Sequence, residues 1–220
     1  LIMSLTAELD VLRQGAINQT PPEALATIED SLEDLSRSGI GARSLKVGDA
    51  APDFLLPNAV GKDVQLFQLL NNGPVVLTFY RGGWCPFCSA ELQAYEHVLD
   101  EIQKLGAMVA AISPQTPDNS MTTAETENLT IEVLSDIHTE AAQKFGIVYH
   151  VQDELQALYA DLGLDLPAFN GDSSFDLPVP ATYVIGADGV IQMAYVDPDY
   201  TRRIDPTEVL SVLRTLQIVA

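Results

Sequence analysis

The two cysteines of this chain, Cys85 and Cys88, lie three residues apart and directly after a short hydrophobic run. That run, Pro74 to Tyr80, is rich in β-branched and aromatic residues, which predicts a buried strand. After a glycine pair, apolar residues recur at helical spacing up to Gly106, which predicts a helix with Cys85 at its start. A disulfide framework needs more cysteines, spread along the chain. A Cys-x-x-Cys between a strand and a helix therefore indicates a chemical role for the two thiols and not a structural one.

The position of each cysteine on the predicted helix gives it a different chemistry. Cys85 lies at the helix start with Pro86 in the first turn, where unpaired backbone N–H groups and the helix dipole favour a thiolate. Arg81 adds a positive charge, so we expect the pKa of Cys85 to lie below the usual value of about 8.5. Cys88 falls on the apolar face of the helix, which predicts a buried and less acidic thiol. We therefore predict Cys85 as the attacking nucleophile and Cys88 as the resolving thiol.

Three other interpretations of the cysteine pair fit the sequence less well. A zinc site needs four ligands, and the three histidines, His97, His138 and His150, are scattered along the chain. Two inert core cysteines would not explain the neighbouring Trp84 and glycines. A static disulfide is unusual in a cytosolic chain. Thiol redox chemistry explains the motif best.

The order of the predicted elements is that of an α/β fold with a mixed central sheet. Strands are predicted at residues 74–80, 108–112, 131–134, 182–186 and 190–196. Helices are predicted after Cys85 and at residues 139–145 and 206–216. The last two strands flank Ala187-Asp188-Gly189, which is typical of a hairpin.

Two segments lie outside this alternating pattern. Residues 4–38 predict two helices, the first capped by Ser4, so we assign residues 1–44 to an N-terminal helical extension and 45–220 to the main domain. The extension is expected to pack on the main domain or on a second copy in a homodimer. Residues 150–178, with one short helix and a polar loop, are interpreted as an insertion that covers the surface or forms one wall of a substrate pocket.

Charge and composition exclude several functions. The chain has 11 Lys plus Arg against 31 Asp plus Glu, a net charge of −20, which disfavours binding to nucleic acids and to anionic membranes. No stretch reaches the 18 or so apolar residues of a membrane span. Leu1 to Asp10 has no basic leader, which favours the cytoplasm. The absence of a phosphate-binding loop, a dinucleotide fingerprint and a nucleophile elbow predicts no nucleotide, flavin or metal cofactor.

Five stretches of the chain resemble the alkyl hydroperoxide reductase/thiol-specific antioxidant branch, or peroxiredoxin-like family, of the thioredoxin-fold superfamily. They correspond to an entry segment, the active-site turn, two core segments and a strand with a proline: residues 47–54, 79–88, 111–114, 133–136 and 179–183. The resemblance extends from Leu45 to the C-terminus. It implies a thioredoxin-like fold, a mixed sheet flanked by helices, with the N-terminal helical hairpin outside the common part.

The resemblance also implies the surroundings of the reactive sulfur. Pro180 would face the Cys85 sulfur across the site and follow a cis peptide bond, a rare feature specific to such turns. From the residues alone, Pro180 fits an ordinary proline at a strand edge equally well. Independently of the resemblance, four further residues are expected to line the substrate pocket, Tyr80, Gly83, Trp84 and Pro86, and core packing is an equally good interpretation of Tyr80.

The chain departs from the family pattern at two positions. A typical peroxiredoxin has Pro-x-x-x-Thr-x-x-Cys and a distant arginine, whereas here Gly82 stands three residues before Cys85 and Pro180 occupies the place of the arginine. The hydrogen bonds that activate peroxide in the family therefore do not carry over directly. Arg81 is a candidate replacement for the missing arginine.

Three functional hypotheses follow. The first is a thiol-dependent peroxidase in which Cys85 becomes a sulfenic acid, Cys88 closes a disulfide, and thioredoxin, glutaredoxin or glutathione reduces it. The second is a general thiol–disulfide oxidoreductase with little peroxidase activity, which the two departures favour. The third is a redox sensor or binding module that changes shape on oxidation. Peroxide turnover, insulin reduction and stoichiometric oxidation distinguish the three.

Overall fold

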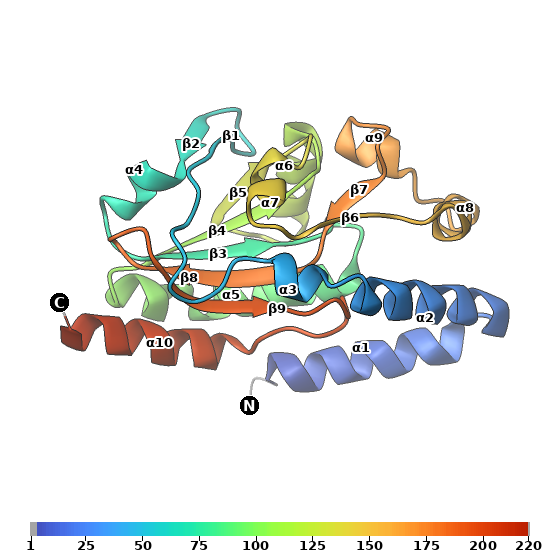
Figure 1. Ribbon diagram of the computed structural model, residues 1–220, viewed down its shortest axis with the longest axis horizontal. Coiled ribbons are helices and arrows are strands. Elements are labelled where there is room, and N and C mark those ends of the chain that lie inside the picture. Colours follow the sequence, from blue (N-terminus) through green and yellow to red (C-terminus); the bar gives the residue numbers. More distant parts are fainter. Residues whose placement is uncertain (1–3, 220) are drawn as a thin grey trace.

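The computed structural model describes residues 4–219, which form a central five-stranded sheet between two layers of helices (Figure 1). The strand order is β5-β4-β3-β8-β9, with β3, β4 and β5 parallel and β8 and β9 antiparallel to their neighbours. The strands are β3 (Val75–Phe79), β4 (Met108–Ser113), β5 (Glu132–Ser135), β8 (Ala181–Ile185) and β9 (Ile191–Val196). The predicted α/β fold with a mixed sheet is confirmed, with small shifts at the strand ends.

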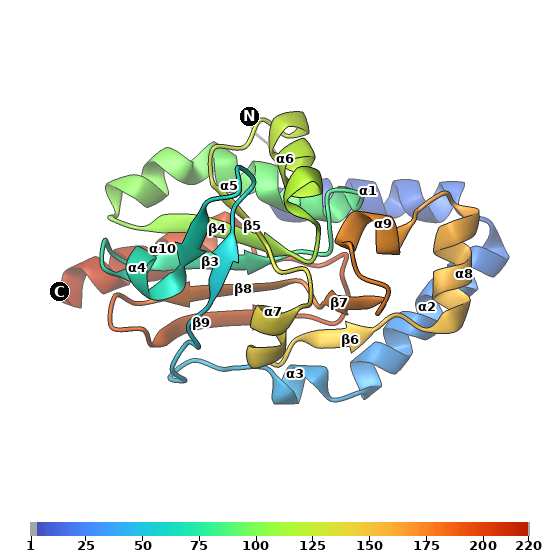
Figure 2. The same ribbon diagram turned by 90° about the horizontal axis from the view of Figure 1, so that it is seen from above.

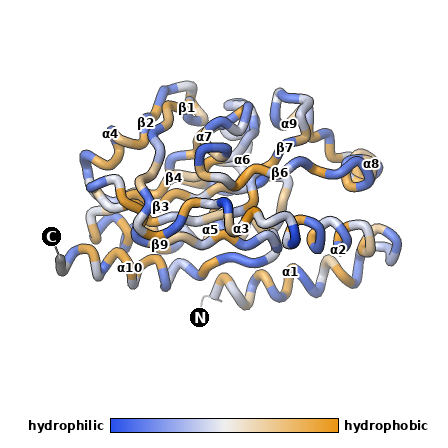
Figure 3. The backbone as a smooth tube through the Cα atoms, in the orientation of Figure 1, coloured by the Kyte–Doolittle hydropathy of each residue, from blue (hydrophilic) through white to orange (hydrophobic). Residues whose placement is uncertain are grey.

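The central strand β3 is buried on both faces because helices cover both sides of the sheet. Its side chains alternate between the two layers, as the pleat of a strand requires. Val76 contributes to the core beneath helices α5, α10 and α1, while Leu77 and Phe79 contribute to the core beneath α4 and α7. These helices are α1 (Leu5–Gln19), α4 (Leu66–Leu70), α5 (Pro86–Lys104), α7 (Glu140–Lys144) and α10 (Pro206–Val219). The hydrophobic strands in the middle of the molecule are visible in Figure 3.

The N-terminal helices form the predicted hairpin. Helix α1 begins after Ser4, whose Oγ accepts a hydrogen bond from the Ala7 N–H (3.3 Å), and α2 (Pro22–Arg37) follows at Pro22. Leu5 and Leu9 of α1 are buried in the same core as α5, so the hairpin packs on the main domain of its own chain. A short helix, α3 (Ile40–Arg43), follows α2. The division into residues 1–44 and 45–220 stays a prediction, and residues 1–3 and 220 lie outside the described residues.

Replacing Leu9 by alanine tests whether the hairpin is an integral part of the fold. Leu9 is 2% exposed, so Leu9→Ala is expected to lower the free energy of unfolding by about 2–4 kcal/mol in urea denaturation. Val11, on the same helix but 62% exposed, is the matched control, and Val11→Ala should change stability by less than about 0.5 kcal/mol. Equal effects of the two variants would show that α1 does not contribute a packed face.

Residues 150–178, for which an insertion stays a prediction, contain more regular structure than the sequence predicted. They include α8 (Asp153–Asp161), a second helix α9 (Leu166–Asn170), and β7 (Asp176–Pro178), which pairs antiparallel with β6 (Val148–His150). The expectation of a single helix was wrong, because the insertion has a small core of its own. That core consists of Val151, Leu155, Tyr159, Leu166 and Leu177. Figures 1 and 2 place α8 and α9 at the same end of the molecule as the α1–α2 turn.

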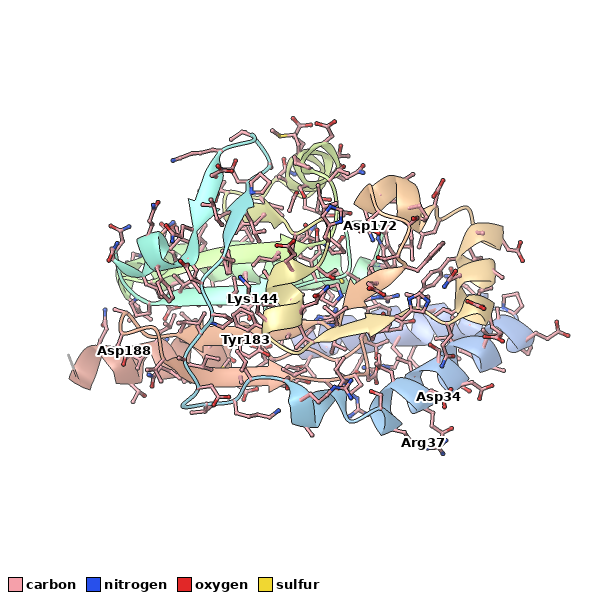
Figure 4. All side chains as sticks on the ribbon, turned by 45° about the horizontal axis from the view of Figure 1, so that its top comes forward. Asp34, Arg37, Lys144, Asp172, Tyr183 and Asp188 are labelled. Carbon is pink, nitrogen blue, oxygen red and sulfur yellow. The ribbon has the colours of Figure 1, made fainter. Side chains whose placement is uncertain are left out.

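Polar side-chain contacts tie residues 150–178 to the rest of the chain. Gln152 Nε2 donates to Asp34 Oδ2 of α2 at 3.0 Å, and His138 Nδ1 lies 2.7 Å from Asp172 Oδ2. Asp34 and Asp172 are labelled in Figure 4. The hydrogen bond that the His138 ring donates to the Asp172 carboxylate raises the pKa of His138, which favours the charged imidazole in this contact. The insertion is therefore attached both to the N-terminal hairpin and to the main domain.

The remaining elements were not predicted from the sequence. They are β1 (Leu55–Pro57) and β2 (Asp63–Gln65), which pair with each other, and α6 (Pro117–Thr126). Within residues 4–219 no helix is long and apolar enough to cross a membrane.

The expected cis peptide bond at Pro180 is wrong. No cis peptide bond occurs between residues 4 and 219. Val179 donates to Ile147 O at 2.8 Å, and Ala181 pairs with Phe79, so the chain is extended on both sides of the proline. A trans bond satisfies this arrangement, because it keeps the chain extended through the proline, whereas a cis bond brings the flanking Cα atoms closer and is typical of a tight turn.

Candidate active site

The Cys-x-x-Cys motif forms the start of α5, as the sequence predicted. Cys85 is the N-cap residue and Pro86 opens the helix. The Cys85 carbonyl accepts the N–H groups of Cys88 (2.9 Å) and Ser89 (3.1 Å), while its own N–H donates to Gly82 O (3.1 Å). Both cysteines are free thiols and are buried, Cys85 at 2% and Cys88 at 0% exposure. The helix thus places the two side chains one turn apart.

Arg81 is the cation closest to Cys85, with its Nη1 4.0 Å from the Cys85 sulfur. It is 2% exposed and makes no ion pair with a carboxylate in the described part of the chain. Its guanidinium carbon lies over three rings instead, 4.7 Å from the centroid of Trp84, 5.8 Å from Tyr159 and 4.1 Å from Tyr200. Its Nη2 also donates to the Tyr159 hydroxyl. A thiolate at Cys85 is therefore the natural counter-charge of Arg81.

The surroundings give the two thiols opposite acidities. A hydrogen bond from the Cys88 thiol, together with the charges of Arg81 and Arg203, lowers the pKa of Cys85 to about 5, although burial opposes this. Burial raises the pKa of Cys88 well above its usual range, and the neighbouring Cys85 adds to that effect. The arrangement holds Cys85 as the thiolate and Cys88 as the neutral thiol at neutral pH.

A second buried cation contacts the other sulfur and was missed by the sequence analysis. Arg203, between β9 and α10, places its Nη2 3.4 Å from the Cys88 sulfur and its Nε 2.6 Å from Glu91 Oε2. Glu91 is completely buried. The neighbouring Arg202 is exposed instead, with an ion pair to Asp199 at 3.1 Å.

A cavity of about 460 Å³ opens above the Cys85 sulfur. Its lining combines the motif with residues from α2, from α8 and the segment after it, from α9 and from the loop after β9. The lining residues are Ile28, Arg81, Trp84, Cys85, Pro86, Phe87, Tyr159, Leu162, Gly163, Leu164, Phe169 and Tyr200. Most of them are apolar or aromatic, and Arg81 is the cation among them. The insertion thus forms one wall of a cavity at the reactive sulfur.

The other residues expected around the pocket do not line this cavity. Tyr80 is completely buried in the core beneath α5, and Pro180 is buried between β7 and β8. Gly83 lies against Thr123 instead, because a Cβ at Gly83 would come within 2.3 Å of the Thr123 hydroxyl. Its N–H donates to Gln115 Oε1 at 2.8 Å. These residues shape the turn beneath the site, while Arg81, Trp84, Cys85 and Pro86 face the cavity.

Gly82 occupies the position where the family has threonine or serine, and the structure explains why a side chain is excluded there. Its φ is 153°, and a Cβ would lie 2.3 Å from Nε1 of Trp84. Gly82→Ser is expected to displace the indole and lower the free energy of unfolding by about 2 kcal/mol. Urea denaturation and Trp84 fluorescence measure both effects. Gly15→Ser, within α1 at a position with open space around the Cβ, is the control and should leave the Trp84 fluorescence unchanged without lowering the free energy of unfolding.

The sequence profile of the AhpC/TSA family matches residues 47–194. The chain belongs to the AhpC/TSA family. Peroxiredoxin Bcp of Escherichia coli K12 is 33% identical over 103 residues, which are 47% of this chain and 65% of the relative. The chain thus matches just under two thirds of that relative's length.

Solved structures of peroxiredoxins share the fold. Peroxidoxin BcpB from Mycobacterium tuberculosis superposes with a TM-score of 0.62 at 24% identity, covering 78% of this chain and 98% of the other. A peroxiredoxin 6 from Arenicola marina superposes with a TM-score of 0.64 at 19% identity, covering 80% of this chain and 74% of the other. The thioredoxin-like fold implied by the resemblance is therefore confirmed for the AhpC/TSA part of the chain.

Metal-ligating side chains do not gather at the site. Within residues 4–219 no group of three or more His, Cys, Asp or Glu side chains is arranged to hold a metal ion.

Proposed function

We propose that this AhpC/TSA chain is a thiol-dependent peroxidase with Cys85 as the nucleophile. The Cys85 thiolate attacks one oxygen of the peroxide, the O–O bond breaks, and the leaving alkoxide or hydroxide takes a proton from solvent. Cys85 becomes a sulfenic acid. Cys88 then forms an S–S bond to it, and the sulfenic oxygen leaves as water with the Cys88 proton. A thiol reductant restores both cysteines.

The single observation that carries this proposal is the Cys85 sulfur at the floor of a cavity, 4.0 Å from a buried arginine that has no carboxylate partner among the residues the structure describes. The helix start and Arg81 favour the thiolate, which is the form that attacks a peroxide. Cys88 is one helical turn away and neutral, ready to close the ring. The names of the relatives agree with this chemistry.

The decisive experiment mixes the reduced protein with hydrogen peroxide or cumene hydroperoxide under rapid mixing. Oxidation is followed by the fluorescence of Trp84, the only tryptophan, and by the mass of the product. We expect a second-order rate constant at least about 100-fold above that of free cysteine at pH 7, because positioned charges stabilise the transition state as well as the thiolate. A rate no higher than that of free cysteine with either peroxide would refute the proposal.

The buried position of Cys85 argues against a general disulfide oxidoreductase as the second candidate. Such an enzyme must bring its sulfur against disulfides of folded proteins, whereas Cys85 is 2% exposed beneath α2 and α8. Insulin reduction by this chain is therefore expected to be slow compared with peroxide reduction.

The reductant is part of the proposal. Thioredoxin, glutaredoxin and glutathione are the three candidates, and the cavity admits a tripeptide-sized thiol more readily than a protein surface. Peroxide turnover measured with the three systems side by side identifies the reductant.

The cytoplasmic location and a homodimer also stay predictions. Fractionation of the source cells and sedimentation analysis test them.

A further inference from the structure

Each sulfur of the motif has its own buried arginine. Arg81 Nη1 lies 4.0 Å from Cys85 Sγ, while Arg203 Nη2 lies 3.4 Å from Cys88 Sγ. The two cations come from different parts of the chain, one from the turn before α5 and one from the loop before α10. We propose that they serve different steps of the reaction, and that Arg203 is the catalytic residue for closing and reopening the disulfide at Cys88. This inference rests on the proposed thiol chemistry of the pair.

Cys88 needs such a partner because it has no contact with solvent. It is completely buried and does not line the cavity, so water cannot stabilise a negative charge on its sulfur. An uncompensated thiolate at such a place is strongly disfavoured. The guanidinium of Arg203 supplies a fixed positive charge within contact distance of that sulfur.

The disulfide steps create negative charge at this sulfur. During closure, Cys88 loses its proton while its sulfur bonds to Cys85, and the sulfenic oxygen leaves with that proton as water. During reduction, a thiolate of the reductant attacks Cys85, which faces the cavity, and the S–S bond breaks. Cys88 then leaves as a thiolate and afterwards takes a proton. The first step, attack of Cys85 on peroxide, places no charge on Cys88.

Glu91 is a positioning residue for Arg203. Its Oε2 accepts from Arg203 Nε at 2.6 Å, and its Oε1 accepts from the hydroxyls of Thr182 (3.2 Å) and Thr78 (3.3 Å). Arg203 Nη1 is held by backbone carbonyls of the same loop, one of them Arg202 O at 2.7 Å. Glu91 therefore fixes the guanidinium and also offsets part of its charge. Removing the carboxylate charge alone should strengthen the attraction of Arg203 for a Cys88 thiolate.

The test measures disulfide opening without any peroxide. Protein oxidised with diamide is reduced by dithiothreitol, and the rate is followed over pH by Trp84 fluorescence. The double variant Arg203→Gln, Glu91→Gln leaves no unpaired buried charge, and its reduction should be about five- to tenfold slower because the leaving thiolate has lost its partner. Glu91→Gln alone should be about two- to threefold faster. Arg202→Gln, which alters an exposed neighbour, should match the wild type.

The double variant and Glu91→Gln are expected to change the rate of disulfide reduction in opposite directions. General structural damage would not produce such a difference. A double variant that reduces at the wild-type rate, or a slower Glu91→Gln, would overturn the role of Arg203. In the Cys88→Ser background, the double substitution should slow dimedone trapping of the Cys85 sulfenic acid less than it slows disulfide reduction, because Arg81 still lies 4.0 Å from the Cys85 sulfur. An equal loss of rate in both steps would overturn the assignment of the two arginines to different steps. If the wild type reacts with no peroxide, the proposed peroxidase activity is refuted. The rate of disulfide reduction by dithiothreitol still tests the role of Arg203, because it needs no peroxide.

Discussion

Cys85→Ser is expected to lower peroxide consumption by about 10³-fold or more. The serine hydroxyl keeps its proton at neutral pH, so Arg81 and the helix start have no anion to stabilise and the attacking group is lost. The fold should be unaffected, because the two side chains have nearly the same shape. Peroxide consumption in the presence of dithiothreitol measures the loss.

The matched variant Cys88→Ser separates the roles of the two sulfurs. It should still react with peroxide once and accumulate a sulfenic acid on Cys85, detected as a dimedone adduct by mass spectrometry. If Cys85→Ser formed the adduct on Cys88 while Cys88→Ser formed none, the assignment of nucleophile and resolving thiol would have to be reversed.

Arg81→Met is expected to slow the reaction of Cys85 with peroxide by about ten- to a hundredfold at pH 5.5. In the wild type the pKa of Cys85 is lowered to about 5, chiefly by the Cys88 hydrogen bond and further by Arg81 and Arg203. The wild-type rate should therefore rise with pH around 5 and be level at pH 7. Loss of an adjacent opposite charge raises such a pKa by about 1–3 units, so the variant should remain protonated to higher pH.

Two measurements check this prediction. The absorbance of the thiolate near 240 nm gives the titration of Cys85, and the rate of peroxide consumption over pH 4–9 gives its kinetic counterpart. Arg81→Lys, which keeps the charge but loses the planar contact with Trp84, Tyr159 and Tyr200, should recover most of the rate at low pH. An Arg81→Met variant with the wild-type pH profile would show that Arg81 does not hold the thiolate.

The sequence alone was sufficient to predict those structural features that depend on residues close together in the chain. The hydrophobic run before the motif became β3, and the apolar spacing after it became α5, because both patterns match the period of the element they form. Cys85 at the N-cap and Pro86 after it were predictable for the same reason. So was the greater burial of Cys88, which lies on the apolar face of the helix.

Prediction from the sequence was wrong where a proline or a short polar segment was interpreted without its packing. The cis bond at Pro180 came from the resemblance alone, while the paired strands around it accept a trans bond. The second helix of the insertion, α9, was missed because five residues are too few to show a helical period. Its Leu166 is buried in a cluster with Leu155, Tyr159 and Leu177, which lie outside the span of the helix itself.

The local sequence thus determined the reactive motif: a strand, a glycine turn, and a cysteine at a helix start. Only the tertiary structure decided the charges and walls around it. Glu91 and Arg203 are 112 positions apart, and Arg81 and Tyr159 are 78 apart, yet each pair is in hydrogen-bond contact. The physical reason is that periodicity and capping act over a few residues, whereas a buried ion pair forms only where folding brings distant segments together and removes water from both.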